Sequence, residues 1–209
     1  MKKMGEIILL IFISSCSVKH LTVTPVNSDR GDAVFGLIVP DNNYGKIEDI
    51  HIYSWTQGGE LNVNRVLIDF NLDKIPSTAI VDSAFLSLYY NSESAYNKIN
   101  GKKGSQGQDK IVIQRVINEW NEQDVTWNKQ PETTTQNQVV IEKKEDNLAD
   151  YTNIDITGII QDMVKNESGR FGIMVRHQEE VPYNVVFFAS GDHADKSLHP
   201  KLEVFYRKK

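Results

Sequence analysis

The feature that most constrains the fold is a series of short segments in which apolar residues alternate with other side chains. Val66, Ile68 and Phe70 alternate in this way, and residues 84–90 repeat the pattern. Side chains with a period of two point to opposite faces of a half-buried β-strand. Further segments are rich in the Val, Ile, Phe and Tyr that pleated surfaces favour. They span residues 110–117, 139–142, 172–177, 184–189 and 201–206.

Some of these segments are apolar on both faces. Ile173, Met174 and Val175 follow one another directly, which is typical of a strand buried in the middle of a sheet. Polar connections separate the strands, among them a Gly-Gly turn at residues 56–60 and a long glycine-containing loop at 96–110. Many short strands joined in this way indicate an all-β fold, a jelly-roll-like antiparallel β-sandwich.

One segment has helical spacing instead. Thr157 is a suitable N-cap, and Gly169 is a suitable stop beyond the C-terminal end. We expect one short amphipathic helix between them that closes one end of the sandwich. Its apolar positions are Ile159, Ile160, Met163 and Val164.

The N-terminus has the pattern of an export signal. Residues 1–6 are basic, and residues 7–13 are apolar but too short to cross a bilayer core of about 30 Å. Residues 1–15 are therefore predicted to be a removable signal peptide. The string Ile13-Ser14-Ser15-Cys16 resembles the bacterial lipobox, in which the cysteine thiol receives the lipid. The alternatives are a secretory signal that Cys16 follows by coincidence and a buried N-terminal strand.

The position after the cysteine bears on location. Ser17 stands where many lipoproteins retained in the inner membrane have an aspartate, so we expect an outer-membrane lipoprotein on the periplasmic face or at the cell surface. Residues 16–29 are predicted to be the lipidated cysteine and a tether. Residues 30–209 are predicted to form one β-sandwich domain.

Composition excludes several classes of function. The chain has a single cysteine, which excludes an intramolecular disulfide and a cysteine metal cluster. Its net charge of −5 lacks the basic footprint of a nucleic-acid-binding protein. The oligomeric state is left open by the sequence.

A set of short motifs occurs along the chain in a recognisable order. The most specific is Asp124-Val125-Thr126-Trp127-Asn128, which follows Trp120. The other motifs lie at residues 32–34, 41–45, 64–72, 75–76, 81–89, 155–157, 172–173, 187–190 and 200–206. This order resembles the DNRLRE domain and is similar to the carbohydrate-binding module family numbered ninety-six.

The resemblance implies a β-sandwich that is non-catalytic. Modules of this kind accompany polysaccharide-degrading enzymes or occur in surface proteins, and some bind acidic polysaccharides. Most of the matched residues look structural, so we expect Trp120 and Trp127 to lie in the core.

A sugar site needs exposed aromatic faces and a few fixed polar groups. The aromatic candidates in polar surroundings are Tyr44, Trp55, Tyr96 and Tyr183. Lysines that could face anionic sugars share the loop of Tyr96, and they are Lys98, Lys102 and Lys103. This loop is the leading ligand hypothesis. The alternative for each residue is an ordinary surface or strand-end position.

A structural calcium ion is the cofactor that such a sandwich could hold, since calcium binds carboxylate and amide oxygens. Two oxygen clusters are candidates: Asp41 with Asn42 and Asn43, and Asp192 with Asp195. The first could equally be an Asx-turn. His193, Asp195 and His199 form a weaker candidate for zinc.

Three functions therefore remain in order of preference. The first is a non-catalytic lipoprotein that binds a polysaccharide. The second is a structural or adhesion protein of the envelope without a glycan ligand. The third is a polysaccharide lyase or hydrolase, although the chain has neither a Gly-x-Ser-x-Gly elbow nor a His-Glu-x-x-His motif.

Overall fold

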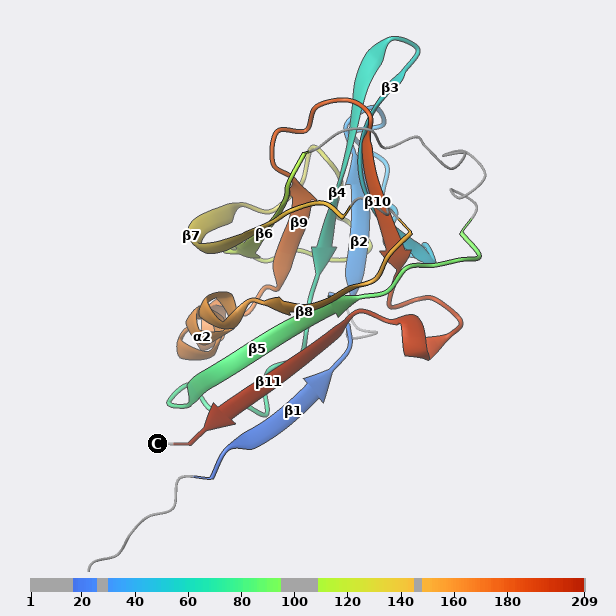
Figure 1. The fold of residues 1–209 in the computed structure, drawn as a ribbon. Helices are drawn as coiled ribbons and strands as arrows, with labels where there is room; N and C mark the ends of the chain where they lie inside the picture. The colour runs from blue at the N-terminus through green and yellow to red at the C-terminus, as the bar shows by residue number, and fades with distance from the viewer. Residues whose placement is uncertain (1–16, 26–29, 95–108, 145–147, 209) are drawn as a thin grey trace, which may run out of the picture.

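The computed structural model describes residues 17–25, 30–94, 109–144 and 148–208 as two antiparallel sheets (Figure 1). The small sheet has the order β1-β11-β5-β8, and its strands are β1 (Lys19–Val23), β11 (Lys201–Arg207), β5 (Ile80–Leu88) and β8 (Tyr151–Asp155). The large sheet has the order β10-β3-β4-β9-β6-β7, with β2 also paired to β4. Its strands are β10 (Asn184–Ala189), β3 (Asp49–Gln57), β4 (Glu60–Ile68), β9 (Ile173–His177), β6 (Ile111–Val116), β7 (Thr133–Ile141) and β2 (Asp32–Gly36).

The main core lies between the two sheets. Val66, Ile113 and Val175 supply it from the large sheet, and Leu86 and Val204 supply it from the small sheet. All five side chains are completely or almost completely buried. The predicted all-β sandwich is therefore confirmed, since the described residues are mostly strands in two antiparallel layers.

A second core covers the outer face of the large sheet. Leu67 and Met174, whose strand neighbours face the main core, pack here against Trp120 and Val125 of the segment 117–131. This covering segment explains why β9 is apolar on both faces. The prediction that Ile173–Val175 belongs to a central strand is confirmed, because β9 pairs with β4 on one side and β6 on the other.

The predicted helix is present as α2 (Thr157–Lys165), and its four expected apolar residues are buried. It packs on β5 of the small sheet and β7 of the large sheet, so it closes one end of the sandwich (Figure 1). The predicted N-cap is wrong. The cap is Ile156, because the hydroxyl of Thr157 donates to Asp155 and accepts from the Ala84 amide of β5.

The C-terminal end of α2 also differs from the expectation. The helix ends at Lys165, and Gly169 lies in the following 3-10 turn η1 (Glu167–Gly169). The carbonyls of Met163 and Val164 accept hydrogen bonds from the guanidinium of Arg170 at 3.2 and 3.1 Å. Arg170, and not Gly169, therefore satisfies these carbonyls at the end of the helix.

Residues assigned to a tether form a strand instead. β1 pairs with β11 over its whole length, from Lys19 opposite Tyr206 to Val23 opposite Leu202. Leu21 and Val23 pack against the main core. The alternation within this five-residue segment is the sequence signal that identifies it as a strand.

The turn predicted at residues 56–60 is confirmed as the tip of the β3–β4 hairpin. Gly58 and Gly59 have φ values of 61° and 91°, which glycine adopts without steric cost. The hairpin extends beyond the rest of the large sheet (Figure 1). In the described part of the chain, no helix has the length and apolar character needed to cross a membrane.

Candidate functional site

Three aromatic rings meet on the β3–β4 hairpin. Tyr53 and Trp55 stack along β3 with ring centroids 6.2 Å apart. Tyr183, just before β10, meets the Trp55 ring edge-on at 5.1 Å. The Tyr183 side chain is half exposed, and the other two are partly exposed. We call these three residues the aromatic platform.

The backbone presents Tyr183 in an unusual conformation. Its φ is 70°, in the left-handed region that bulky side chains rarely adopt. Glu180, three residues earlier, has a φ of 53°. Such conformations cost free energy and persist only where the surroundings enforce them, often at functional sites. The β9–β10 connection is therefore shaped so that the Tyr183 ring lies against Trp55.

Arg65 holds this connection in place. Its guanidinium donates two hydrogen bonds to the carboxylate of Glu180, at 2.7 and 2.8 Å. It also donates to Gln130 at 2.7 Å and lies 4.5 Å from the ring centroid of Trp127. Arg65 thus ties the loop that carries Tyr183 to the segment that covers the large sheet.

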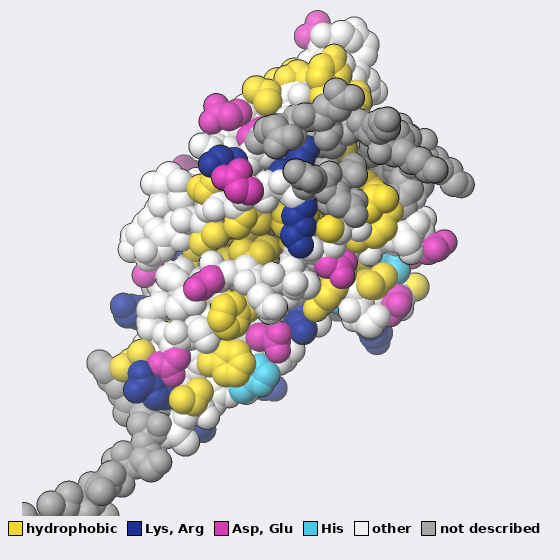
Figure 2. Space-filling view, in the orientation of Figure 1, with side chains coloured by type: hydrophobic (Ala, Val, Ile, Leu, Met, Phe, Trp, Pro, Cys, Tyr) yellow, Lys and Arg dark blue, Asp and Glu magenta, His cyan; other side chains and the backbone are white. Residues whose placement is uncertain are grey.

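The loop of Tyr183 carries a further exposed apolar side chain. Val181, two residues before Tyr183, is 48% exposed. Figure 2 shows hydrophobic side chains gathered near the hairpin, below its tip. Aromatic and aliphatic faces of this kind can stack on the apolar face of a pyranose ring.

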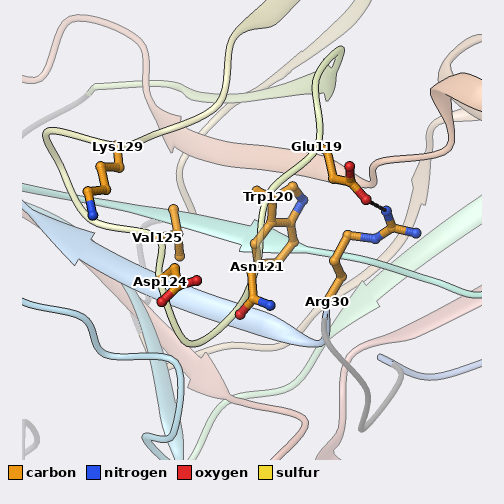
Figure 3. A pocket seen from close by; sticks show the side chains of 7 residues that line it. All are labelled: Arg30, Glu119, Trp120, Asn121, Asp124, Val125 and Lys129. Atoms are coloured by element: carbon orange, nitrogen blue, oxygen red, sulfur yellow. Dashed lines mark ion pairs between the residues drawn. The ribbon is translucent and has the colours of Figure 1, made fainter.

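A larger depression lies elsewhere, against the covering segment (Figure 3). It has a volume of about 630 Å³ and is lined mainly by polar and charged side chains. Arg30 and Glu119 face each other across it at 3.6 Å. Trp120 turns its indole inward and donates to the Phe171 carbonyl at 2.7 Å, so only 6% of the residue is exposed. This depression therefore offers no aromatic face for stacking.

A sequence-family model decides the relationship to known proteins. The model of carbohydrate-binding module family 96 matches residues 32–206, which is most of the chain. The chain belongs to carbohydrate-binding module family 96. No curated protein matches it. The predicted family resemblance is confirmed, and family 96 modules are typically non-catalytic.

The module brings together only some of the residues predicted to bind sugar. Trp55 and Tyr183 are in contact, whereas Tyr44 bridges to Val34 of β2 and packs against the main core. Sequence reasoning missed Tyr53, although its two-residue spacing from Trp55 on a strand indicates a shared face. Tyr96, Lys98, Lys102, Lys103 and Cys16 lie outside the described residues.

The tryptophans expected in the core are found there. Trp120 belongs to the second core, and Trp127 packs partly buried against it. Both come from the Asp-Val-Thr-Trp region that carries the most specific family motif. In this module the motif therefore holds the covering segment on the sheet.

The first set of residues proposed to bind calcium forms hydrogen bonds that hold loops together. Asn43 donates to the carbonyls of Glu122 and Val125, both at 2.7 Å, and accepts from the Gly45 amide as in an Asx-turn. Asp41 accepts from Asn128 at 2.9 Å. Within the described ranges, no three His, Cys, Asp or Glu side chains are placed to hold a metal ion. Calcium stays a prediction.

The side chains of the second proposed metal cluster also contact other protein groups. Asp195 accepts from the amide and hydroxyl of Ser197, at the start of the 3-10 turn η2 (Lys196–Leu198). His193 Nδ1 accepts from the Asp195 amide at 3.1 Å, and His199 Nε2 lies 2.8 Å from the His193 carbonyl. Asp192 lies 3.9 Å from the Lys46 ammonium.

Asp192 belongs to a buried acidic group beneath the covering segment. Asp32 accepts from the Gly191 amide at 2.6 Å, and its own amide donates to Glu122. Lys46 pairs with Glu122. Burial raises the pKa of Asp32 to about 7, and the neighbouring carboxylates of Asp192 and Glu122 add to this shift.

Other ionisable groups with shifted pKa values are buried in the sandwich. Burial lowers the pKa of His51 and of His177 to about 4, so both rings are neutral at pH 7. Burial raises the pKa of Asp69 to about 6, although Arg30 opposes the shift. Asp69 lines a small pocket of about 300 Å³, in which its carboxylate accepts from Arg30 at 3.2 Å.

Proposed function

We propose that this chain is an outer-membrane lipoprotein whose module binds a polysaccharide, without catalysis, on the aromatic platform of Tyr53, Trp55 and Tyr183. The observation that carries the proposal is the contact between Trp55 and a half-exposed Tyr183 held at positive φ. Membership of family 96 supports carbohydrate as the ligand class.

The platform supplies what sugar recognition needs. Its rings are fixed by strand β3 and by the ion pair of Arg65 with Glu180, so little conformational entropy is lost when a glycan stacks on them. Val181, in the same loop as Tyr183, adds exposed apolar surface. By contrast, Arg30 and Glu119 of the 630 Å³ depression pair with each other, and its tryptophan ring is buried.

The lipoprotein part of the proposal comes from the N-terminus. A basic segment, a short apolar segment and Ile13-Ser14-Ser15-Cys16 precede the first strand directly. Several acyl chains on Cys16 would give stable membrane attachment. Ser17 in place of aspartate supports the outer membrane.

The test is a binding screen of residues 17–209 against alginate, pectin, chondroitin-type and neutral polysaccharides, with calcium and with chelator. We expect saturable binding to one polymer class and a loss of at least tenfold in Trp55→Ala. Val140→Ala is the control, because Val140 is exposed on β7, at the opposite edge of the large sheet from β10 and β3, and we expect this variant to keep the affinity. Equal binding by both variants and the parent would contradict the platform.

Two other functions remain as outcomes of the same screen. Folded protein that binds no polymer would favour a structural or adhesion role in the envelope. Depolymerisation of a bound polymer, abolished in Asp69→Asn, would favour a lyase or hydrolase, since Asp69 is the acid with a raised pKa that lines a pocket.

A further inference from the structure

The first strand begins very close to the proposed lipid. Lys19 opens β1 only three residues after Cys16. Because a fully extended residue spans at most about 3.6 Å, Lys19 lies within about 11 Å of the anchored residue. A tether of this length leaves the domain little freedom to turn over at a membrane surface.

β1 is fixed to the body of the domain. All five of its residues pair with β11, and the His20 ring stacks on Phe205 with centroids 4.4 Å apart. Leu21 and Val23 are anchored in the main core. The orientation of β1, the first described strand after Cys16, is therefore that of the small sheet.

The end of the sheet nearest to Cys16 has the chemistry of a membrane-facing surface. Lys19 and Lys208 supply positive charge there, and Val18 and Ile80 are 58% and 39% exposed. Ile80 pairs with Arg207, and Lys19 pairs with the adjacent Tyr206, so these residues share one end. The Asp82 carboxylate nearby is already paired with Arg207 at 2.7 Å. Figure 2 shows basic and hydrophobic side chains together at this end, at the lower left.

The aromatic platform lies far from this surface. In Figure 1 the chain end after β11 and the start of β1 are at the lower left, whereas the β3–β4 hairpin is at the top. Basic side chains favour anionic lipid headgroups, and exposed aliphatic ones favour the interface. The hairpin tip carries Glu60 instead, a side chain that such a surface repels.

We propose that the end bearing Lys19, Ile80, Arg207 and Lys208 rests on the lipid headgroups and directs the aromatic platform away from the membrane. The inference rests on the proposed lipid anchor at Cys16 but not on sugar binding. It gives the module a fixed orientation in which a polymer can reach Trp55 and Tyr183 without passing the bilayer.

Energy transfer from labelled protein to labelled lipid tests this orientation. The full chain, purified from membranes, is reconstituted in vesicles of phosphatidylcholine with 30% phosphatidylglycerol and a rhodamine headgroup lipid. Lipidation consumes the only native thiol, so a new cysteine takes a donor dye uniquely. Thr78→Cys places the dye two residues before Ile80, and Glu60→Cys places it at the hairpin tip. We expect at least threefold stronger transfer from position 78 than from position 60.

Two results would overturn the proposal. Equal transfer from the two positions, in protein whose mass shows acylation, would overturn the orientation alone. Protein without an acyl mass increment that stays off the vesicles would overturn both the anchor and the orientation. Polysaccharide binding by residues 17–209, measured separately, reports on the platform in either case. Cys16→Ser chains carrying the same labels are the control and are expected to show only background transfer.

Discussion

Two regions of this module use tryptophan in opposite ways. Trp120 belongs to the covering segment, where its indole nitrogen donates to a carbonyl and its ring fills the second core. Trp55 lies on the β3–β4 hairpin, where its partners are two other rings and solvent. The residue type therefore does not distinguish a structural ring from a ligand-binding one. The residues that surround the ring, from other strands and loops, distinguish the two roles.

The same contrast applies to the polar groups of the two regions. Beneath the covering segment, Asn43, Asp32 and Glu122 form hydrogen bonds that fasten loops to strands. Near the platform, the Arg65–Glu180 pair places a loop so that Tyr183 is presented at positive φ. One region uses its polar groups to close the fold, and the other uses them to hold an exposed surface in shape.

The largest expected effect separates the two tryptophans by stability. Trp120→Ala removes a buried ring and should lower the free energy of unfolding by about 3–5 kcal/mol. Trp55→Ala should cost about 1 kcal/mol, because its ring is partly in water already. Urea denaturation followed by far-UV circular dichroism measures both. If Trp120→Ala does not fold, Trp120→Phe should still lose more stability than Trp55→Phe.

If Trp55→Ala lowered the free energy of unfolding as much as Trp120→Ala does, the two tryptophans would not differ in role. Such a result would mean that the platform is a third core and that solvent does not reach it. Sugar binding by Trp55→Ala at the parental affinity would lead to the same conclusion.

The second prediction concerns pH and the buried acidic group. The pKa of Asp32 in the folded state is about 7, above its ordinary value of 3.8, so folding takes up a proton between these values. The stability contributed by protonated Asp32 is complete below pH 3.8 and is lost as the pH rises through 7. Asp32→Asn cannot ionise. Its stability relative to the parent should therefore rise by about 3 kcal/mol between pH 5 and pH 8.

The informative quantity is the difference in the free energy of unfolding between variant and parent, because other buried groups titrate in the same pH range. Protonation of His51 and His177 destabilises the fold as the pH falls, and Asp69 acts in the opposite direction. These contributions cancel when Asp32→Asn is compared with the parent at each pH. Asn121→Ser, which changes an uncharged side chain of the covering segment, is the control, and its stability relative to the parent should not change with pH. A flat difference for Asp32→Asn as well would show that Asp32 is ionised in the folded protein.

Sequence patterns predicted much of the fold because periodicity reports local burial. The alternation around Val66–Phe70 and 84–90 identified β4 and β5, and the run at 173–175 identified a strand covered on both faces. The identity of the cover was not predictable. It depends on Trp120 and Val125, which meet Leu67 and Met174 only after the chain has folded.

The platform was predictable only in part for the same reason. Polar surroundings pointed to Trp55 and Tyr183 separately, but their contact depends on the pairing of Asn184 with Ser54. Tyr44 has surroundings just as polar in sequence, yet it bridges to Val34 and faces the core. Likewise, threonine is a common N-cap residue, but the Thr157 hydroxyl accepts a hydrogen bond from the Ala84 amide of β5 instead. Contacts distant in sequence decide each case.

The smallest expected change in stability accompanies a large change in binding, and it concerns Tyr183. Glycine adopts positive φ freely, so Tyr183→Gly relieves a strain of about 1–2 kcal/mol. The same substitution removes an edge-on ring contact worth about 0.5–1.5 kcal/mol and raises the entropy of the unfolded chain. These effects oppose one another, so the free energy of unfolding should change by less than about 1 kcal/mol.

Binding should respond very differently, because the exposed ring is lost completely. We expect the affinity of Tyr183→Gly for the polymer found in the screen to fall at least tenfold, which isothermal titration calorimetry measures. Gln178→Ala, an exposed polar residue in the same loop, controls for the change of loop surface and should lose less than threefold. A stable Tyr183→Gly variant with the parental affinity would mean that the strained tyrosine serves the loop alone. The left-handed backbone would then be explained by the Arg65–Glu180 pair, and the glycan site would have to be sought away from the hairpin.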